Sequence, residues 1–500
     1  MIYLKNLNQE KTPFFTKLKE YGESDVVPFD VPGHKLGRLP NDLSAFAGKG
    51  IYQLDANAPR GLDTLSKPTG VIKEAQALAA EAFGADKAYF LTSGTTGGII
   101  AMIMATVSAK EKIILPRNVH KSVINALIFS GAVPVFVKPD IDNNLGIANG
   151  VSLTQMKKAI DEHPDAKAVF VINPTYFGVV SDLKNIVDYA HSKDMIVMCD
   201  EAHGAQFYFS NLLPQSAMAA GADVAATSMH KTGVSLTQSS ILLTKGDRID
   251  NAKIQSTLNM IHSTSPSAIL LSSLDVARKQ MYFEGEKGIK KALDLRNKMM
   301  PKFNEIPGVE IIGEAYALKR GFDFGFDSTK LVIKVADIGL TGFDVYRTLK
   351  DRFDIQLELA ETYLVLAIIT MATTKRDLDR LYQALKTISD ENYEQNQSLP
   401  KIKFHYNFPE TYVRPREAYH APHKIVPLAD SENEISAESI MIYPPGIPLL
   451  IPGEVINTQF LEDLDFYQQS GSVIFSELNN GYVKVIDKDN WQKWEDSDEL

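Results

Sequence analysis

The sequence predicts an α/β protein whose main part is built on a mainly parallel β-sheet. Seven short apolar runs recur along the chain at regular distances, and their near-continuous apolar character suits strands that are buried on both faces. Between most of them lie segments whose apolar residues recur at helical spacing. This alternation of strand and helix is typical of a parallel sheet. Ligands bind such sheets beyond the carboxyl ends of the strands, and the chemically interesting residues of this chain follow strand ends.

The individual elements are predicted in order along the chain. Residues 1–40 are expected to form an arm or loop, because prolines and glycines punctuate their end. An Ala-rich helix is predicted over Val71–Phe83. The predicted strands lie at 88–93, 112–117, 132–138, 168–174, 195–200, 223–228 and 239–244. The predicted intervening helices lie at 97–108, 122–131, 153–163 and 183–193.

A second, smaller α/β unit is predicted after a break near Gly285–Gly288. It combines a long helix, two strands and a closing helix over 375–388, and the polar run 388–400 is expected to be a linker. The last hundred residues are expected to form a separate C-terminal piece. The predicted domains are an N-terminal arm (1–40), a large domain (41–288), a small α/β domain (289–392) and a C-terminal α+β domain (393–500).

Composition and charge narrow the class of protein. The net charge of −10 argues against a nucleic-acid or anionic-membrane partner and suits a cationic substrate. Cys199 is the single cysteine, so an intrachain disulfide framework is excluded, which fits a reducing cytoplasm. The first residues lack an apolar run, so no signal peptide is expected, and no membrane-spanning segment is predicted.

Lys231 is the central candidate residue. It lies in a polar segment directly after the predicted strand 223–228, so we expect it on a tight loop at a strand end. A lysine is rarely buried unless its charge is compensated. Condensation of the lysine amine with an aldehyde gives a Schiff base, which removes the need to compensate a buried ammonium charge. Pyridoxal phosphate is the aldehyde that most often needs such a lysine. The alternative is an ordinary exposed loop lysine.

A glycine-rich turn upstream is a candidate phosphate site. The segment Leu91–Gly98 follows a predicted strand and opens a helix, whose N-terminal N–H groups can bind an anion. Ser93, Thr95 and Thr96 add hydroxyl groups. Helix capping by Ser or Thr is the simpler alternative.

Two further strand ends carry residues that suit the same cofactor. Asp200 would emerge at the end of the strand 195–200, where a carboxylate can pair with the pyridine nitrogen and keep it protonated. His203 could bond the phenolic oxygen of the ring, and His120, after the strand 112–117, could stack on the ring and donate a proton. Capping by Asp200 and a structural role for His120 are the alternatives.

The order and spacing of these pieces agree with one another. The phosphate turn comes first, then Asp200, and Lys231 follows 31 residues later (231 − 200 = 31). The segment His262–Ala268 adds another group of hydroxyl side chains that includes Thr264. Taken together, these residues predict a pyridoxal phosphate site and no metal site.

With these motifs the chain resembles the Orn/Lys/Arg decarboxylases, which have the PLP-dependent aspartate-aminotransferase-like fold (fold type I). The resemblance covers nearly the whole chain, and within the family it is greatest to the short Gram-positive-type arginine decarboxylases. Besides the segments above, it is carried by FDVPGHK (29–35), GLDTL (61–65), EAFGA (81–85), INPTYFGV (172–179) and YPPGIPLLIPGE (443–454). The last segment is the most specific to the family.

The resemblance implies a role for each position. It implies that Lys231 carries the cofactor, that Asp200 holds the pyridine nitrogen, and that His203 lies near the phenolic oxygen. It also implies that His120 stacks on the ring, and that Thr264 reaches the phosphate of a neighbouring subunit. The residues expected around the phosphate are Ser93, Gly94, Thr95, Ser228 and His230. The long inducible members of the family have a tryptophan where His203 stands.

The implied reaction is the decarboxylation of a basic amino acid, with L-arginine giving agmatine for polyamine biosynthesis as the first expectation. Lysine and ornithine are the alternative substrates. A carboxylate is needed for the cationic side chain of the substrate, and the candidates are Asp63, Glu358, Glu361 and Glu454. An aminotransferase or lyase, and an inactive regulatory paralogue, are the alternatives of other classes. A cytoplasmic homodimer or larger homo-oligomer is expected.

Overall fold

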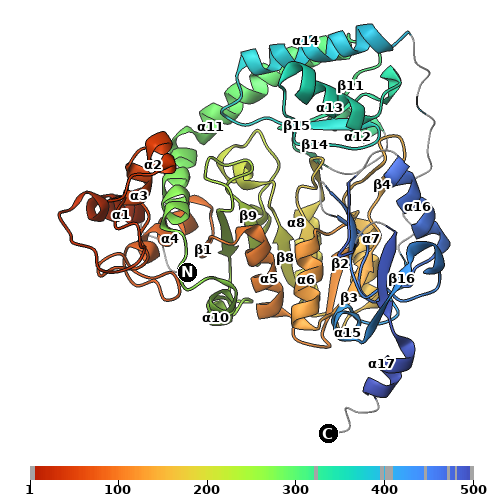
Figure 1. Cartoon of the computed structure of the whole chain (residues 1–500), viewed down its shortest axis with the longest axis horizontal. Helices are drawn as coiled ribbons and strands as arrows, with labels where there is room; N and C mark the ends of the chain where they lie inside the picture. The colour runs from red at the N-terminus through yellow and green to blue at the C-terminus, as the bar shows by residue number, and fades with distance from the viewer. Residues whose placement is uncertain are drawn as a thin grey trace. The chain divides into compact units, whose positions relative to one another are not determined.

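The computed structural model of the chain describes residues 6–319, 325–394, 399, 409–443, 447–469, 473–478 and 481–495 (Figure 1). Residues 444–446 of the motif 443–454, and part of the linker expected at 388–400, lie outside the described residues. The chain divides into two compact units, Met1–Thr106 with Ile196–Lys290, and Val107–Met195 with Lys291–Leu500. The four domain boundaries given above stay a prediction.

The first unit contains four largely buried strands, of which β1, β8 and β9 end and β10 begins next to the candidate residues. They are β1 (Lys87–Leu91), β8 (Ile196–Asp200), β9 (Val224–Ser228) and β10 (Ser240–Thr244). Their order is β1-β10-β9-β8, with β8 parallel to β9 and β10 antiparallel to both of its neighbours. The predicted strands in this part of the chain are confirmed.

Helix α5 (Gly94–Thr106) is largely buried, which explains why its sequence is apolar all round. A Cβ atom at Gly98 would lie 2.8 Å from Leu91 and 3.1 Å from Ala226, so glycine lets the helix approach the strands closely. The other helices here are α1 (Pro13–Glu23), α2 (Asp42–Ala47), α3 (Gly50–Gln53), α4 (Val71–Ala82), η1 (Ala205–Phe209), α9 (Ala217–Ala220) and α10 (Asn251–Ile261). The N-terminal arm expected over 1–40 therefore includes one regular helix.

The second unit contributes three strands that are all parallel. They are β2 (Lys112–Pro116), β3 (Val133–Val137) and β6 (Ala168–Ile172), in the order β6-β2-β3. The helices that follow them are α6 (Lys121–Ser130), α7 (Leu153–Glu162) and α8 (Leu183–Ser192). Both the strands and the helices were predicted from the apolar pattern. Short strand pairs accompany them: β4 (Ile141–Asp142) with β5 (Ile147–Ala148), and β7 (Val179–Val180) with β12 (Gly325–Phe326).

A smaller sheet in the second unit is antiparallel. Its order is β11-β13-β15-β14, and its apolar residues share a core with α13 and α14. The strands are β11 (Glu310–Ile312), β13 (Lys330–Lys334), β14 (Leu359–Ala360) and β15 (Leu364–Ile368), and the helices and turns are α12 (Glu314–Lys319), η2 (Ala336–Ile338), α13 (Gly342–Phe353) and α14 (Lys375–Asn392). This is the small α/β part that the sequence predicts.

The C-terminal part mixes short strands with helices, as expected for an α+β piece. Its elements are α15 (Pro415–His420), β16 (His423–Pro427), η3 (Leu428–Asp430), β17 (Ile440–Tyr443), β18 (Ile447–Leu450), α16 (Thr458–Gln469), β19 (Val473–Phe475), β20 (Tyr482–Ile486) and α17 (Lys488–Glu495). β16 pairs with β20, and β17 lies between β18 and β19.

One predicted feature of the secondary structure is wrong. The break expected near Gly285–Gly288 does not interrupt the helix, since α11 runs continuously over Ala268–Asn304. A boundary between the two compact units does fall close to it, between Lys290 and Lys291. Gly285 has a packing reason instead: a Cβ atom there would lie 2.9 Å from the Cβ atom of Phe209. The glycine therefore allows close contact between α11 and η1.

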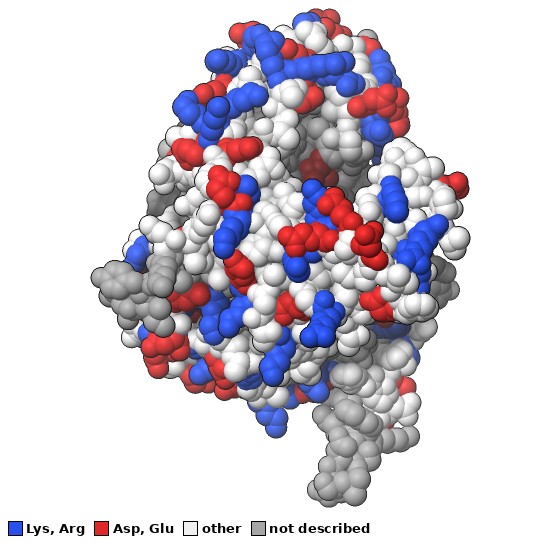
Figure 2. Space-filling model, turned by 90° about the vertical axis from the view of Figure 1, so that its left-hand side faces the viewer, with Lys and Arg blue, Asp and Glu red and all other residues white. Residues whose placement is uncertain are grey.

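The distribution of surface charge and the hydropathy of the helices indicate which kinds of partner are possible. On the face drawn in Figure 2, basic and acidic side chains are interspersed over most of the surface, so this face carries no extended patch of one sign. Among the described residues, no helix is both long enough and apolar enough to cross a membrane.

Candidate active site

Lys231 lies in the turn directly after β9, as the sequence predicts. Its backbone N–H donates to the carbonyl oxygen of Ser228 (3.4 Å), and its side chain is half-buried. The Nζ atom lies 2.9 Å from Nε2 of His203, a side chain that is only 5% exposed. A charged lysine can only donate, so His203 Nε2 accepts from it. The two residues that the sequence assigned separately to one cofactor therefore meet.

Asp200 is the last residue of β8, and it is buried. Its Oδ1 atom accepts a hydrogen bond from the N–H of Ala202 (3.1 Å). Burial raises the pKa of Asp200, and the Ala202 hydrogen bond and the charge of Lys231 oppose that rise. A buried carboxylate of this kind is stabilised by a cationic partner. It is thus suited to hold a protonated ring nitrogen.

A cluster of hydroxyl groups lies at the N-terminus of α5. Thr95 Oγ1 lies 2.6 Å from Ser228 Oγ and 3.0 Å from Ser240 Oγ, and all three residues are buried. The Oγ atom of Ser93 is also buried, and it has no hydrogen-bond partner among the described residues. Gly94 begins the helix with φ of +70°, a conformation that favours glycine. An unpaired buried hydroxyl beside free helical N–H groups suits an anionic ligand.

The remaining predicted phosphate contacts differ in their surroundings. His230 Nδ1 lies 3.0 Å from the carbonyl oxygen of Ser239. A carbonyl can only accept, so Nδ1 carries a proton, and Nε2 can donate to an anion only when the ring is charged. Thr264 is exposed, in the segment between α10 and α11. That exposure leaves Thr264 accessible to a neighbouring subunit, as the resemblance implies.

His120 belongs to the second unit, where it is the N-cap residue of α6. Its Nδ1 atom accepts the backbone N–H of Ser122 (3.2 Å), and Ser122 Oγ lies 2.9 Å from the same nitrogen. Because a backbone N–H can only donate, the proton of the neutral ring is on Nε2. This fixes both the orientation of the ring and the atom that can move a proton.

Glu201, next to Asp200, is a buried carboxylate with a different set of partners. It bonds the hydroxyl of Tyr208, and its Oε1 atom accepts the N–H of Ala217 (2.8 Å). Burial raises the pKa of Glu201 to about 8, although these two hydrogen bonds oppose the rise. The residue thereby holds the segment that carries His203, and Gly204 has to be small because a Cβ atom there would lie 2.6 Å from Glu201 Cγ.

We expect Glu201→Gln to change how stability depends on pH. Because the pKa of Glu201 is higher in the folded protein than in the unfolded chain, the folded state favours the protonated side chain. The resulting stability is fully present below the unfolded pKa of 4.5, and it is lost as the pH rises through about 8. The glutamine variant keeps both hydrogen bonds and has no charge, so it should be more stable than the original protein above pH 8. The expected difference is up to a few kcal/mol, at about 1.4 kcal/mol per pKa unit.

Urea midpoints measured from pH 4.5 to pH 9 in both proteins test this expectation. Glu23→Gln, an exposed change on α1, is the control. Parallel profiles for the Glu201→Gln variant and the original protein would contradict the assigned role of burial.

Two of the four candidate substrate carboxylates are engaged by the chain itself. The oxygens of Asp63 accept backbone N–H groups of Thr64 (2.9 Å), Thr69 (3.0 Å) and Gly70 (2.8 Å). Partial burial alone would raise the pKa of Asp63, but these hydrogen bonds outweigh it and lower the pKa. Asp63 therefore serves to fix the turn before α4. This favours a structural role over the substrate contact expected from the sequence.

Glu454 is likewise occupied. Both of its oxygens bind the guanidinium of Arg117, at 2.9 Å and 2.7 Å, and Oε2 also accepts the N–H of Ile451 (2.9 Å). Both charged residues are fully buried. A carboxylate so engaged has little capacity left for a substrate, which favours a structural role here as well.

Glu358 and Glu361 remain as substrate candidates. Glu358 is exposed, and its Oε1 atom accepts from the hydroxyl of Tyr176 (2.5 Å). Glu361 follows β14 and is 8% exposed, and within the described part of the chain its carboxylate has no hydrogen-bond partner. Burial raises the pKa of Glu361 to about 8. A buried carboxylate without a partner is the one that gains most from a bound cation.

Asn173 is a residue whose chemistry the sequence interpretation missed. It directly follows β6 and is fully buried, and neither polar atom of its side chain has a hydrogen-bond partner among the described residues. Such unsatisfied groups are rare in native proteins, and they suggest a ligand or a bound water. A polar residue directly after an apolar strand was the available signal.

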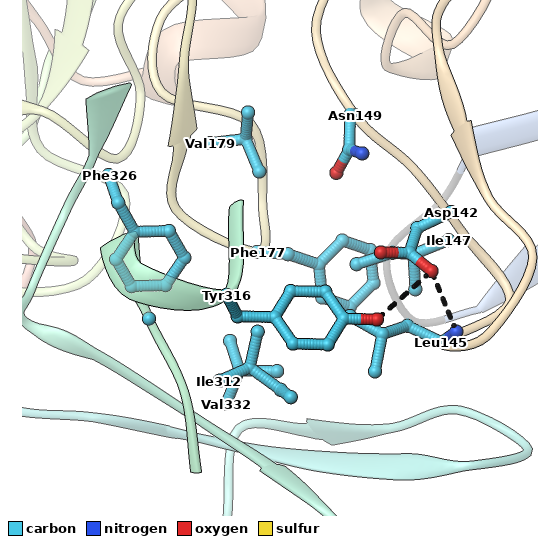
Figure 3. A pocket seen from close by; sticks show the side chains of 11 residues that line it. Asp142, Leu145, Ile147, Asn149, Phe177, Val179, Ile312, Tyr316, Phe326 and Val332 are labelled. Carbon is cyan, nitrogen blue, oxygen red and sulfur yellow. Dashed lines mark hydrogen bonds between the residues drawn. The ribbon is translucent and has the colours of Figure 1, made fainter. Parts of the chain in front are cut away.

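A cavity in the second unit is too small to hold an amino acid. Figure 3 shows that Tyr316 points its hydroxyl toward Asp142 across an apolar lining, and the two oxygens involved are 3.3 Å apart. The cavity measures about 20 Å³, which is room for roughly one water molecule. It is therefore no candidate for the substrate site.

The chain is similar to known proteins over most of its length. The family model "Orn/Lys/Arg decarboxylase, major domain" matches residues 12–320, and the model of the C-terminal domain of that family matches residues 398–474. The chain is 44% identical to an arginine decarboxylase of Bacillus subtilis over 95% of each chain. It is 43% identical to an arginine decarboxylase of Halalkalibacterium halodurans, over 90% of this chain and 91% of the relative.

Solved structures agree on the fold. The lysine decarboxylase LdcF of Francisella novicida matches with a TM-score of 0.82 at 23% identity, over 95% of this chain and 81% of that one. An alanine–glyoxylate aminotransferase of Nostoc sp. matches with a TM-score of 0.53 at 15% identity, over 74% of this chain and 98% of that one. The predicted fold class, aspartate-aminotransferase-like with a C-terminal addition, is confirmed.

Proposed function

The chain belongs to the Orn/Lys/Arg decarboxylase family, and on this premise we propose that it is a pyridoxal-phosphate-dependent enzyme that converts L-arginine to agmatine and carbon dioxide. The observation that carries the choice of arginine is the identity of 43–44% to arginine decarboxylases over at least 90% of the chain. Lysine and ornithine remain the alternative substrates.

The residues present fit the cofactor. The buried hydroxyl of Ser93, which has no hydrogen-bond partner in the described part of the chain and lies beside the N-terminus of α5, supports a phosphate site. The contact of 2.9 Å between Lys231 and His203 supports a site for the aldehyde and the phenolic oxygen. In this proposal Ser93, Gly94, Thr95, Ser228 and His230 bind the phosphate, with Thr264 of a neighbouring subunit. Asp200 binds the pyridine nitrogen.

When bound, pyridoxal phosphate would supply an aldehyde for amines and a ring that accepts the electron pair of the broken bond. The chain's own residues prepare for this. Asp200 is buried, so its charge acts in a low-dielectric setting and keeps a ring nitrogen protonated. Lys231 Nζ gives up a proton before it can act as a nucleophile, and His203 Nε2 at 2.9 Å is positioned to take it.

Protonation of the product carbon needs a second proton source. Two groups suit it: the Nζ atom of Lys231, and the Nε2 atom of His120, which carries the ring proton because Nδ1 is engaged by Ser122. The N-cap bond keeps the His120 ring in one orientation, which suits stacking on a flat cofactor. We propose that His120 both stacks on the cofactor ring and donates this proton.

We propose that Glu361 binds the cationic side chain of the substrate, with Glu358 as the second candidate. Glu361→Gln should raise KM for arginine by about tenfold to a hundredfold, since a hydrogen bond to a charged group contributes about 1.5–3 kcal/mol. With a pKa near 8, Glu361 binds a cation better as the pH rises, so KM of the unchanged enzyme should fall between pH 6 and pH 8.

Steady-state kinetics of Glu361→Gln, Glu358→Gln and the exposed control Glu310→Gln separate the candidates. Equal KM values for all three variants and the unchanged enzyme would remove both residues from the substrate site.

The proposal extends to the setting of the enzyme. It includes assembly as a homodimer or larger homo-oligomer, a cytoplasmic location and a place in polyamine biosynthesis. The direct test of the proposed reaction is to incubate the purified protein with arginine, with and without pyridoxal phosphate, and to measure carbon dioxide and agmatine. Equal amounts of both products, formed only with the cofactor, are expected. A keto acid in their place would instead favour an aminotransferase.

A further inference from the structure

We propose that Glu454 is a positioning residue that acts on His120 through Arg117. The proposal rests on the proposed function, in which His120 stacks on the cofactor. Glu454 is separated from Arg117 by 337 residues along the chain, and it lies in the part of the sequence that follows β18. The proposal therefore gives the C-terminal part of the chain a task at the site.

The contact between Arg117 and Glu454 is geometrically constrained. The Nε atom of Arg117 donates to Oε1 (2.9 Å) and Nη2 donates to Oε2 (2.7 Å), which is the paired arrangement that fits a planar guanidinium to a carboxylate. Nη1 donates to the carbonyl oxygen of Pro448 (2.9 Å), and Nη2 lies 3.3 Å from that of Leu449. These contacts together fix the position and the orientation of the guanidinium.

Because the ion pair is buried, removing only one of its two charges is costly. Neither Arg117 nor Glu454 is exposed, and removal of one member of a buried pair leaves the other charge without compensation. A buried ion pair adds little net stability compared with apolar residues of the same shape. What this pair supplies is a fixed place for Arg117.

Arg117 is joined to His120 by a short, anchored segment. The N–H of Arg117 donates to the carbonyl oxygen of Val137 (3.0 Å) at the end of β3, and the side-chain amide of Asn118 donates to the carbonyl oxygen of Asn149 (3.1 Å). His120, two residues after Asn118, is the N-cap residue of α6, and its Nδ1 atom accepts the N–H of Ser122. The His120 ring is therefore located from one side by the ion pair and from the other side by the helix.

Loss of the Glu454 charge should release the first of these two constraints. Arg117 would then seek another partner, and residues 117–120 would move with it. Small misplacements of a group that must face a reacting molecule are costly for the rate. We therefore expect Glu454→Gln, which keeps the shape of the side chain, to lower kcat about tenfold to a hundredfold with KM nearly unchanged.

The decisive readouts are those that a general loss of stability would not give. In the cofactor-free protein, amide hydrogen exchange at residues 117–122 should be faster in Glu454→Gln. The dissociation constant of pyridoxal phosphate, from its absorbance, should rise. In the His120→Ala background, Glu454→Gln should have almost no further effect on kcat or on cofactor binding.

A matched control is available in the same part of the chain. Glu438 is also fully buried, and its oxygens accept the N–H groups of Lys484 (2.8 Å) and Glu477 (2.7 Å). Glu438→Gln should affect the C-terminal part without faster exchange at 117–122. If Glu454→Gln does not fold, Arg117→Lys keeps the charge, loses the paired geometry and should give the same three changes.

The proposal would be overturned if the effects of Glu454→Gln and His120→Ala on cofactor binding were additive. It would also be overturned if amide hydrogen exchange at residues 117–122 were the same in Glu454→Gln as in the original protein. Failure of the proposed function gives a different result, namely no decarboxylation by the unchanged protein. The exchange experiment reports on the link between Glu454 and His120 in either case.

Discussion

Replacement of Lys231 by alanine should abolish arginine decarboxylation, with a loss of at least about a thousandfold, or about 4 kcal/mol in activation free energy. The reason is that Lys231 is the amine that would bind the cofactor aldehyde, beside His203 at 2.9 Å. The absorbance band that arises from a covalent link between lysine and pyridoxal phosphate should disappear with it. Single-turnover assays and absorbance spectra of the purified variant measure both effects.

The matched control is Lys245→Ala. Lys245 also follows a strand end in the first unit, and its Nζ atom donates to the carbonyl oxygen of Met218 (2.9 Å). It should keep both the activity and the absorbance band. Retained decarboxylation in Lys231→Ala would contradict the assignment of the cofactor lysine.

Asp200→Asn should lower kcat about a thousandfold, again about 4 kcal/mol. The carboxylate is buried at the end of β8, so water is poorly placed to replace its charge opposite a ring nitrogen. The asparagine variant keeps the shape of the side chain and can still accept the N–H of Ala202, so the turn should stay folded. Steady-state kinetics at saturating cofactor measure the effect.

Glu201→Gln is the control for this change, because it removes a neighbouring buried carboxylate whose partners are Tyr208 and Ala217. It should keep kcat within a few-fold. Similar losses in both variants would mean that the effect comes from the fold of the segment 200–217, and would contradict the role given to Asp200.

The strands and helices around the site could be predicted because their causes are local. Apolar runs such as 196–200 and 224–228 are buried on both faces, and the residues after them lie at the carboxyl ends of parallel strands. The position of Lys231 and the burial of Asp200 follow from that pattern. The uninterrupted α11 could not be predicted, because Gly285 is explained by contact with Phe209, which is distant in the sequence.

The role of each candidate carboxylate could not be predicted from the sequence, because it also depends on contacts with residues that are distant along the chain. Asp63 and Glu361 are both acidic residues outside regular secondary structure. Only the fold shows that backbone N–H groups surround Asp63, and that Glu361 is buried with no hydrogen-bond partner among the described residues. Glu454 depends on Arg117, which is 337 residues away. A carboxylate is defined by what it contacts, and such contacts are not written in local spacing.

The measurement that tests the central claim most directly is a competition between substrates. The purified protein with pyridoxal phosphate is incubated with equal concentrations of arginine, lysine and ornithine, and the amines are quantified over time. Agmatine as the dominant product, absent with the Lys231→Ala variant, is the predicted result. Cadaverine or putrescine as the dominant product would contradict the specificity for arginine, and the absence of any amine product would contradict the proposed reaction.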